Sequence, residues 1–181
     1  TFVVDVSGSM REQSRLELVK HAMRLLVGEL DARDSLSIVA FTNDARLVLP
    51  MTSARHRGLI ESAIHPLQPE GGTNVQAGLR MGYEAALAGL SSEANNRVVL
   101  LSDGVGNIGE TDADALNREV ARQRDSGIYL NTVGVGMNNH DDAFLEQLAD
   151  KGDGICNYVD DEREARRALV EHFTGAFETI A

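Results

Sequence analysis

Short apolar runs alternate with longer stretches of helical periodicity along the whole chain. This alternation is typical of an α/β layer fold built on a mostly parallel sheet. Two of the runs, Leu36–Phe41 and Val98–Leu101, are apolar on both faces, as central strands covered by helices must be. The sequence therefore predicts an α/β fold with strands near residues 1–5, 35–41, 45–49, 97–103, 128–135 and 155–160.

The expected strand at 45–49 differs from the others in how it is connected. It begins only a few residues after the strand that ends at Phe41, whereas parallel neighbours need a crossover of a dozen or more residues. We therefore expect an antiparallel edge strand that ends at Pro50.

The expected helices carry apolar residues at intervals of three and four positions. The first helix begins near Ser14, and its apolar stripe consists of Leu16, Val19, Met23, Leu26 and Leu30. A second helix follows Thr73 and turns inward Val75, Leu79 and Ala86. Further helices are expected near residues 54–65, 112–126, 141–151 and 162–179.

Size and composition favour a single folded domain over residues 1–181. A chain of 181 residues is long enough for one substantial core and short for two. Hydrophobic residues make up 43%, and the three prolines leave no linker or low-complexity stretch. Because the sequence starts at Thr1, inside an expected strand, we expect a domain excised from a longer chain. We expect no membrane insertion by this fragment, since it has no apolar run of transmembrane length.

The charge balance argues against two classes of partner. The chain has 17 Lys and Arg against 28 Asp and Glu, a formal net charge of -11. Nucleic acid and anionic membrane surfaces would be repelled overall, and we expect neither as a partner. The single cysteine, Cys156, cannot form an internal disulfide, and we expect it to be buried in a strand.

Oxygen-bearing residues follow the carboxyl ends of the expected strands, where open α/β sheets bind ligands. Asp5, Ser7 and Ser9 occur in "DVSGSM", Thr73 occurs in "EGGTN", and Asp103 occurs in "LLSDG". Oxygen ligands without sulfur or imidazole suit a hard divalent cation. The simpler alternative is that Asp5 and Ser7 only satisfy backbone amides in a turn and that Thr73 only caps a helix.

The charge of this set indicates what such a cation could do. Two carboxylates at most balance a dication, and three hydroxyls add no charge. The metal therefore stays more electrophilic than one surrounded by many acids. Magnesium takes about six oxygens and readily keeps waters. A carboxylate from another molecule could therefore fill the remaining position.

These three segments resemble the metal loops of von Willebrand factor type A (VWA) domains. "DVSGSM" is similar to the family's DxSxS motif, and Thr73 and Asp103 fall at its second and third metal loops. The longer stretches "SIVAFTNDARLVLP" and "NRVVLLSDGVGNIGETD" are similar to bacterial members of the family. The resemblance implies a Rossmann-like, doubly wound sheet in the order 3-2-1-4-5-6, with strand 3 antiparallel at the edge and helices on both faces.

The resemblance also implies an intact metal-ion-dependent adhesion site (MIDAS). In that site Ser7 and Ser9 bind the metal directly, Asp5 and Asp103 act largely through water or hydrogen bonds, and Thr73 moves between direct and indirect contact. The implied metal is Mg²⁺, with Mn²⁺ or Ca²⁺ as alternatives. The implied function is non-enzymatic capture of an Asp or Glu carboxylate of a protein partner. The expected state is a monomeric domain, and the family slightly favours the cell envelope or an extracytoplasmic location over the cytoplasm.

Two other functions stay open at this point. The domain could be a scaffold or regulatory module in a multidomain or ATPase-associated assembly. Magnesium and acids at adjacent strand ends also serve phosphoryl transfer through an aspartyl phosphate. Such enzymes want an acid two residues after the nucleophile, where this chain has Ser7, and a positioned lysine, for which only Lys20 and Lys151 exist.

Overall fold

The computed structural model describes residues 1–103, 113–136 and 142–168. Within them, six strands form one mixed sheet in the order β3-β2-β1-β4-β5-β6. The strands are β1 (Phe2–Asp5), β2 (Ser35–Phe41), β3 (Ala45–Ser53), β4 (Asn96–Ser102), β5 (Ile128–Val135) and β6 (Cys156–Val159). All neighbouring pairs are parallel except β2 with β3. The predicted order and the antiparallel edge strand are therefore confirmed.

The prediction that this edge strand ends at Pro50 is wrong, because β3 continues to Ser53. Pro50 is tolerated because β3 lies at the edge of the sheet, where a residue without an amide hydrogen need not break a ladder. The register with β2 also shifts around this point, between the pairs Leu36–Thr52 and Ile38–Leu49. This bulge gives Pro50 a place outside the regular pairing.

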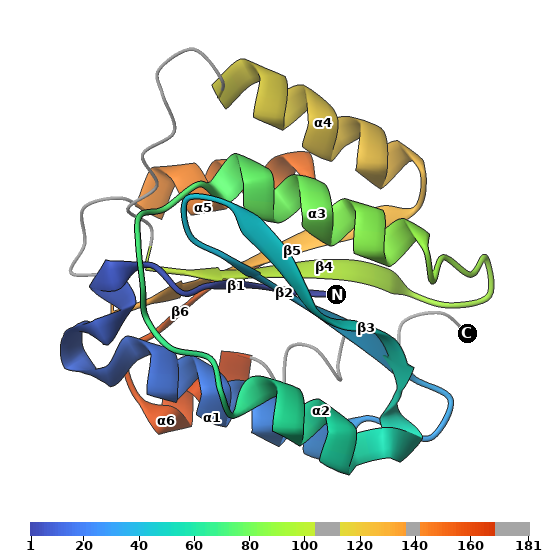
Figure 1. Cartoon of the computed structure of the whole chain (residues 1–181). Coiled ribbons are helices and arrows are strands. Elements are labelled where there is room, and N and C mark those ends of the chain that lie inside the picture. The colour runs from blue at the N-terminus through green and yellow to red at the C-terminus, as the bar shows by residue number, and fades with distance from the viewer. Residues whose placement is uncertain (104–112, 137–141, 169–181) are drawn as a thin grey trace.

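Helices cover both faces of the sheet (Figure 1). On one face lie α1 (Arg15–Glu29), α2 (Arg57–Ile64) and α6 (Glu162–Arg166), and on the other lie α3 (Val75–Leu87), α4 (Ala113–Asp125) and α5 (Asp142–Lys151). Two short 3₁₀ helices precede α1 and α2, namely η1 (Gly8–Ser14) and η2 (Ala54–His56). The expected last helix is described only as α6, and the residues after 168 lie outside the described part.

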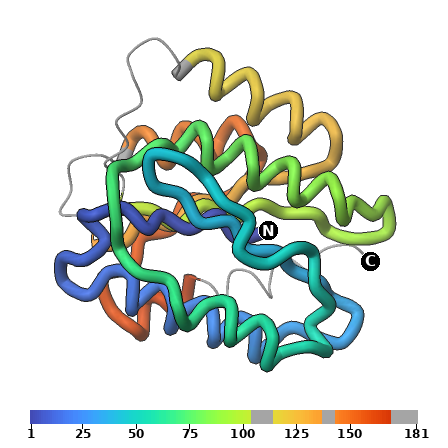
Figure 2. Tube along the Cα trace, viewed as in Figure 1, coloured from blue at the N-terminus to red at the C-terminus, as the bar shows by residue number. Residues whose placement is uncertain are grey.

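Side chains of each strand alternate between two apolar cores. Phe2 and Val4 of β1 belong to the core under α1, whereas Val3 belongs to the core under α3. The two helical layers lie on opposite sides of the sheet, as the chain trace shows (Figure 2). Cys156, expected to be buried, is partly exposed because β6 forms the other edge of the sheet.

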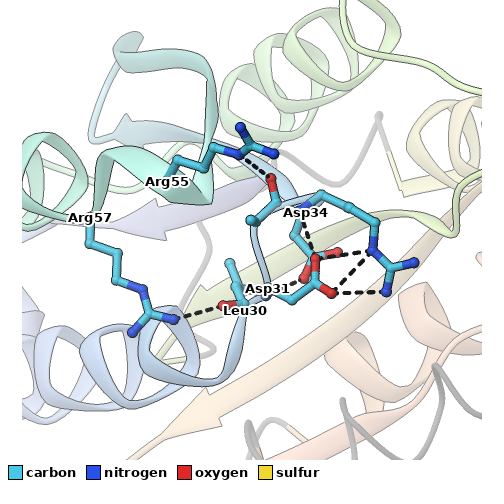
Figure 3. Close-up of polar contacts among 7 residues, drawn as sticks. Leu30, Asp31, Asp34, Arg55 and Arg57 are labelled. Carbon is cyan, nitrogen blue, oxygen red and sulfur yellow. Dashed lines mark hydrogen bonds and ion pairs between the residues drawn. The ribbon is translucent and has the colours of Figure 1, made fainter.

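The turn between α1 and β2 lies at the amino end of β2, away from the strand ends that carry the expected site. Two arginines from the segment after β3 hold it (Figure 3). Arg55 Nε donates to the Ala32 carbonyl at 3.3 Å, and Arg57 Nη2 donates to the Leu30 carbonyl at 2.8 Å. Within the turn, the Asp31 amide donates to Asp34 Oδ2 at 2.7 Å. These arginines are thus engaged in holding the fold.

No helix among the described residues combines the length and the apolar character that a membrane span needs.

Candidate functional site

The first loop of the candidate site is built around Asp5, the last residue of β1. Its side chain is fully buried. Oδ1 accepts a hydrogen bond from the Ser7 amide at 2.8 Å, and Oδ2 accepts one from Ser102 Oγ at 2.7 Å. Ser102 ends β4, which pairs with β1 in parallel, so the sheet itself brings these two strand ends together. Asp5 therefore closes the loop and links it to the neighbouring strand.

The two serines of the DxSxS segment face each other. Ser7 is buried and Ser9 is half-buried, and their hydroxyl oxygens lie 3.0 Å apart. Ser7 precedes the 3₁₀ helix η1, yet its side chain makes no capping hydrogen bond there. The turn alternative thus accounts for the Asp5 carboxylate but not for the paired hydroxyls of Ser7 and Ser9.

The second loop, residues 70–74, packs directly against the first. The Gly8 amide donates to the Gly71 carbonyl at 3.0 Å, and the Glu70 amide donates to the Val6 carbonyl at 2.7 Å. A Cβ on Gly8 would lie only 3.3 Å from the Gly71 oxygen. Gly71 has φ +66°, a conformation that favours glycine. The two glycines therefore allow the close approach of the loops.

Thr73 lies in this second loop and is half-buried. The N-cap of α3 is the next residue, Asn74, whose side chain accepts from the Ala77 amide at 3.0 Å. The alternative that Thr73 caps this helix is therefore wrong. Among the described residues, the Thr73 hydroxyl makes no hydrogen bond to Asp5, Ser7, Ser9 or Asp103.

The third loop begins with Asp103, directly after β4. Its side chain has no exposed surface. Oδ2 accepts from Arg15 Nη1 at 3.0 Å, whereas Oδ1 is buried and has no hydrogen-bond partner among the described residues. A buried carboxylate oxygen without a partner is costly and calls for a ligand such as water or a cation.

Burial dominates the electrostatics of Asp5. It raises the pKa of the Asp5 carboxyl above its usual value, hydrogen bonds from Ser102 and Ser7 oppose the rise, and the charge of Asp103 adds to it. The two carboxylates therefore sense each other in a region of little solvent. A dication placed between them would relieve this repulsion, so the donor set fits a divalent metal.

The charge of the site is low for a metal centre. The described residues contain no group of three or more His, Cys, Asp or Glu side chains able to hold a metal ion. The five predicted ligands include only two acids, so a cation here would depend on hydroxyls and waters for the rest of its coordination. That Asp5, Ser7, Ser9, Thr73 and Asp103 form a metal site stays a prediction.

Sequence reasoning missed Arg15, which the structure places against Asp103. Arg15 is the first residue of α1, and nothing in the local pattern distinguishes it from other helix arginines. Its partners lie 88 and 121 positions away, at Asp103 and at the Gly136 carbonyl. Only the tertiary fold reveals this contact.

Comparison with known proteins finds similar sequences and similar folds. The family model described as von Willebrand factor type A domain matches residues 1–105. The uncharacterized protein YfbK of Escherichia coli (strain K12) is 38% identical over 180 residues, which is 99% of this chain and 31% of that protein.

Two solved structures share the fold. The conserved hypothetical protein BatB from Bacteroides thetaiotaomicron has a TM-score of 0.80 at 21% identity, and the match covers 96% of both chains. The pilus adhesin SpaC from Lactobacillus rhamnosus GG has a TM-score of 0.77 at 16% identity, over 98% of this chain and 30% of that one. At these sequence identities, the solved structures show only that the fold is shared.

The family assignment thus rests on the match over residues 1–105 and on the shared sheet order. The chain spans 31% of the length of YfbK, so it corresponds to one part of that relative. The chain belongs to the von Willebrand factor type A domain family.

Proposed function

We propose that the domain binds a protein partner through a divalent cation held by Asp5, Ser7, Ser9, Thr73 and Asp103. The observation that carries this proposal is the buried Asp103 Oδ1, which has no partner among the described residues at the end of a strand close to Asp5. Mg²⁺ is the first choice because the donors are all oxygen, and Mn²⁺ and Ca²⁺ are the alternatives. Domains of this family are commonly protein-interaction modules.

The proposed partner presents an Asp or Glu carboxylate. The acids Asp5 and Asp103 balance the charge of a dication, and Arg15, which is paired with Asp103, adds one positive charge. The filled site therefore has a net positive charge, and its cation keeps exchangeable waters. A carboxylate that replaces one water would complete the coordination and offset that charge. The cation would also overcome the repulsion that a domain of net charge -11 exerts on an acidic partner.

The first experiment is calorimetric titration of Mg²⁺ and Mn²⁺ into the wild type and into a Ser7→Ala/Ser9→Ala variant. We expect one saturable site in the wild type and its loss in the variant. The control is Ser62→Ala/Ser92→Ala, which removes two exposed hydroxyls elsewhere and should bind like the wild type. Equal binding by the folded site variant and the wild type would contradict the proposal.

The carboxylate step is tested with N-acetylaspartate as the probe. Water-proton relaxation by bound Mn²⁺ reports the number of exchanging waters on the metal. We expect the relaxation enhancement to fall as the probe is added and to remain unchanged with N-acetylasparagine α-amide, which has no free carboxylate. No difference between the two probes would show that the metal does not capture carboxylates.

A scaffold role is the second candidate, in which the same metal loops serve docking inside a larger assembly. A phosphoryl-transfer enzyme is less well supported. Position 7 carries a serine, and Lys20 is ion-paired with Glu17 within α1 at 2.7 Å. Hydrolysis of p-nitrophenyl phosphate that requires Mg²⁺ and disappears in Asp5→Asn would reverse this preference.

The proposed location is the cell envelope or an extracytoplasmic space, and the proposed state is a monomer. The support for the location is indirect, since SpaC, which shares the fold, is a pilus adhesin.

A further inference from the structure

Arg15 joins the ends of two strands at the carboxyl edge of the sheet. Its Nη1 donates to Asp103 Oδ2 at 3.0 Å, and its Nη2 donates to the Gly136 carbonyl, at the end of β5, at 3.0 Å. The Arg15 side chain is 13% exposed and that of Asp103 is 0% exposed. Solvent therefore screens this ion pair only weakly, in contrast to a surface pair.

The backbone around Gly136 is shaped to admit this guanidinium. Gly136 has φ +65°, and a Cβ there would lie 2.5 Å from Arg15 Nε and 3.0 Å from Arg15 Cγ. Any larger residue would displace the arginine side chain. The fit indicates that Arg15 has a defined place beside the site.

Other cations near the loops are engaged elsewhere. Arg11 donates to the Pro69 carbonyl at 3.1 Å, and Arg46 lies 3.3 Å from Glu70. Among the described residues, Arg15 is the only Lys, Arg or His in an ion pair with Asp5 or Asp103. A second acid, Glu12, reaches Arg15 Nη1 only at 3.8 Å and is 72% exposed, so it competes weakly with Asp103.

We infer that Arg15 is a resident counter-ion of the proposed metal site: it holds the Asp103 carboxylate when no metal is bound and lowers the affinity of the site for a dication. The inference rests on the proposed function. Without metal, Arg15 compensates one of the two buried carboxylates. When a dication arrives, the fixed guanidinium charge repels it through a region of low dielectric. Through its charge, Arg15 thus sets how readily the site fills.

The test compares Mn²⁺ binding by the wild type, Arg15→Met, Arg15→Lys and the control Arg24→Met. Met keeps much of the volume of the arginine stem and removes its charge. We expect the Mn²⁺ Kd of Arg15→Met to fall about tenfold, since a unit charge close to a dication is removed. Arg15→Lys keeps the charge and should return toward the wild-type Kd, and Arg24→Met, on the same helix, should match the wild type.

A weaker or unchanged Mn²⁺ affinity of Arg15→Met would overturn the inference. Weaker binding would mean that Arg15 chiefly orients Asp103 as a ligand. Arg15→Lys and Arg15→Met behaving alike would mean that the charge of residue 15 is irrelevant.

A metal-free arm separates this inference from the proposed function. In EDTA, we expect the melting temperature of Arg15→Met to fall by roughly 10 °C, because a buried carboxylate loses its counter-ion. Adding Asp103→Asn should recover part of this loss, because the uncompensated charge is then gone. If the wild type binds no metal, the proposed function fails while this cycle still measures the ion pair. If Arg15→Met melts like the wild type in EDTA, the inference fails although the metal site can stand.

Discussion

Helix α3 packs against the sheet through two glycines one turn apart, and Gly82→Ala tests that packing. Gly78 faces Phe41 of β2, and Gly82 faces Val3 of β1. A Cβ on Gly82 would lie 2.3 Å from Val3 Cγ2. Val3 is fully buried, so its side chain has no solvent-filled space to move into. Because a β-branched side chain has little rotamer freedom, the helix or the strand must move.

The magnitude follows from two opposing terms. Overpacking in a dense core costs about 1–3 kcal/mol, and the alanine gains about 1 kcal/mol of helix propensity over glycine. We expect Gly82→Ala to lower the free energy of unfolding by up to about 2 kcal/mol. The matched control is Gly28→Ala in α1, where no atom lies within 4 Å of the new Cβ. This control should raise the free energy of unfolding by up to about 1 kcal/mol.

Urea unfolding in EDTA measures these changes without the contribution of bound metal. The comparison requires that the free energy of unfolding falls with urea concentration at the same slope in both variants. Because α3 starts directly after the second loop of the candidate site, a displaced helix also moves Thr73. We therefore expect Gly82→Ala, but not Gly28→Ala, to weaken Mn²⁺ binding. Equal and stabilising effects of the two substitutions would refute the reasoning, since the close approach of α3 to β1 would then be absent in solution.

Two further variants separate the fold from the site. Asn74→Ala removes the cap of α3 and should lower the free energy of unfolding by about 1 kcal/mol, as measured by urea unfolding. It should also weaken Mn²⁺ binding, as measured by calorimetry. Unchanged Mn²⁺ affinity would show that the cap does not position Thr73. Arg57→Ala removes the bond to the Leu30 carbonyl and should cost about 1 kcal/mol of stability while leaving the Mn²⁺ Kd as in the wild type, and an altered Kd would contradict the separation of that turn from the site.

The sheet was predictable because its information is local. Alternating apolar runs and helical stripes place all six strands, and the short connection after Phe41 is enough to make β3 antiparallel. The order of the strands came from the family resemblance, since parallel strands carry no local mark of their neighbours. The predicted end of β3 was wrong because proline interrupts a central strand but is tolerated in an edge strand such as β3.

The candidate site was predictable only in part, because only some of its contacts join residues that are close in the sequence. Asp5, Ser7 and Ser9 are close in sequence, and their contacts follow from one turn. The cap of α3 was ambiguous because Thr73 and Asn74 are both good capping residues in consecutive positions. Arg15 could not be found from sequence, because its position depends on how β4 and β5 end beside α1.

The formal charges of these residues place the two proposed binding events in an order. Asp5, Asp103 and Arg15 together carry one negative charge, a bound dication changes this to one positive charge, and a partner carboxylate brings the cluster to neutrality. A partly buried cluster is most stable when its charge is balanced, so metal and carboxylate should favour each other, and by linkage each raises the affinity for the other. Without Arg15 the metal-bound cluster would already be neutral. Arg15→Met should then bind Mn²⁺ more tightly and N-acetylaspartate less tightly than the wild type. The positive charge of Arg15 would thus lower the affinity for the metal and raise the affinity of the metal-bound site for a carboxylate. A variant that gained affinity for both would show that charge balance does not couple the two ligands.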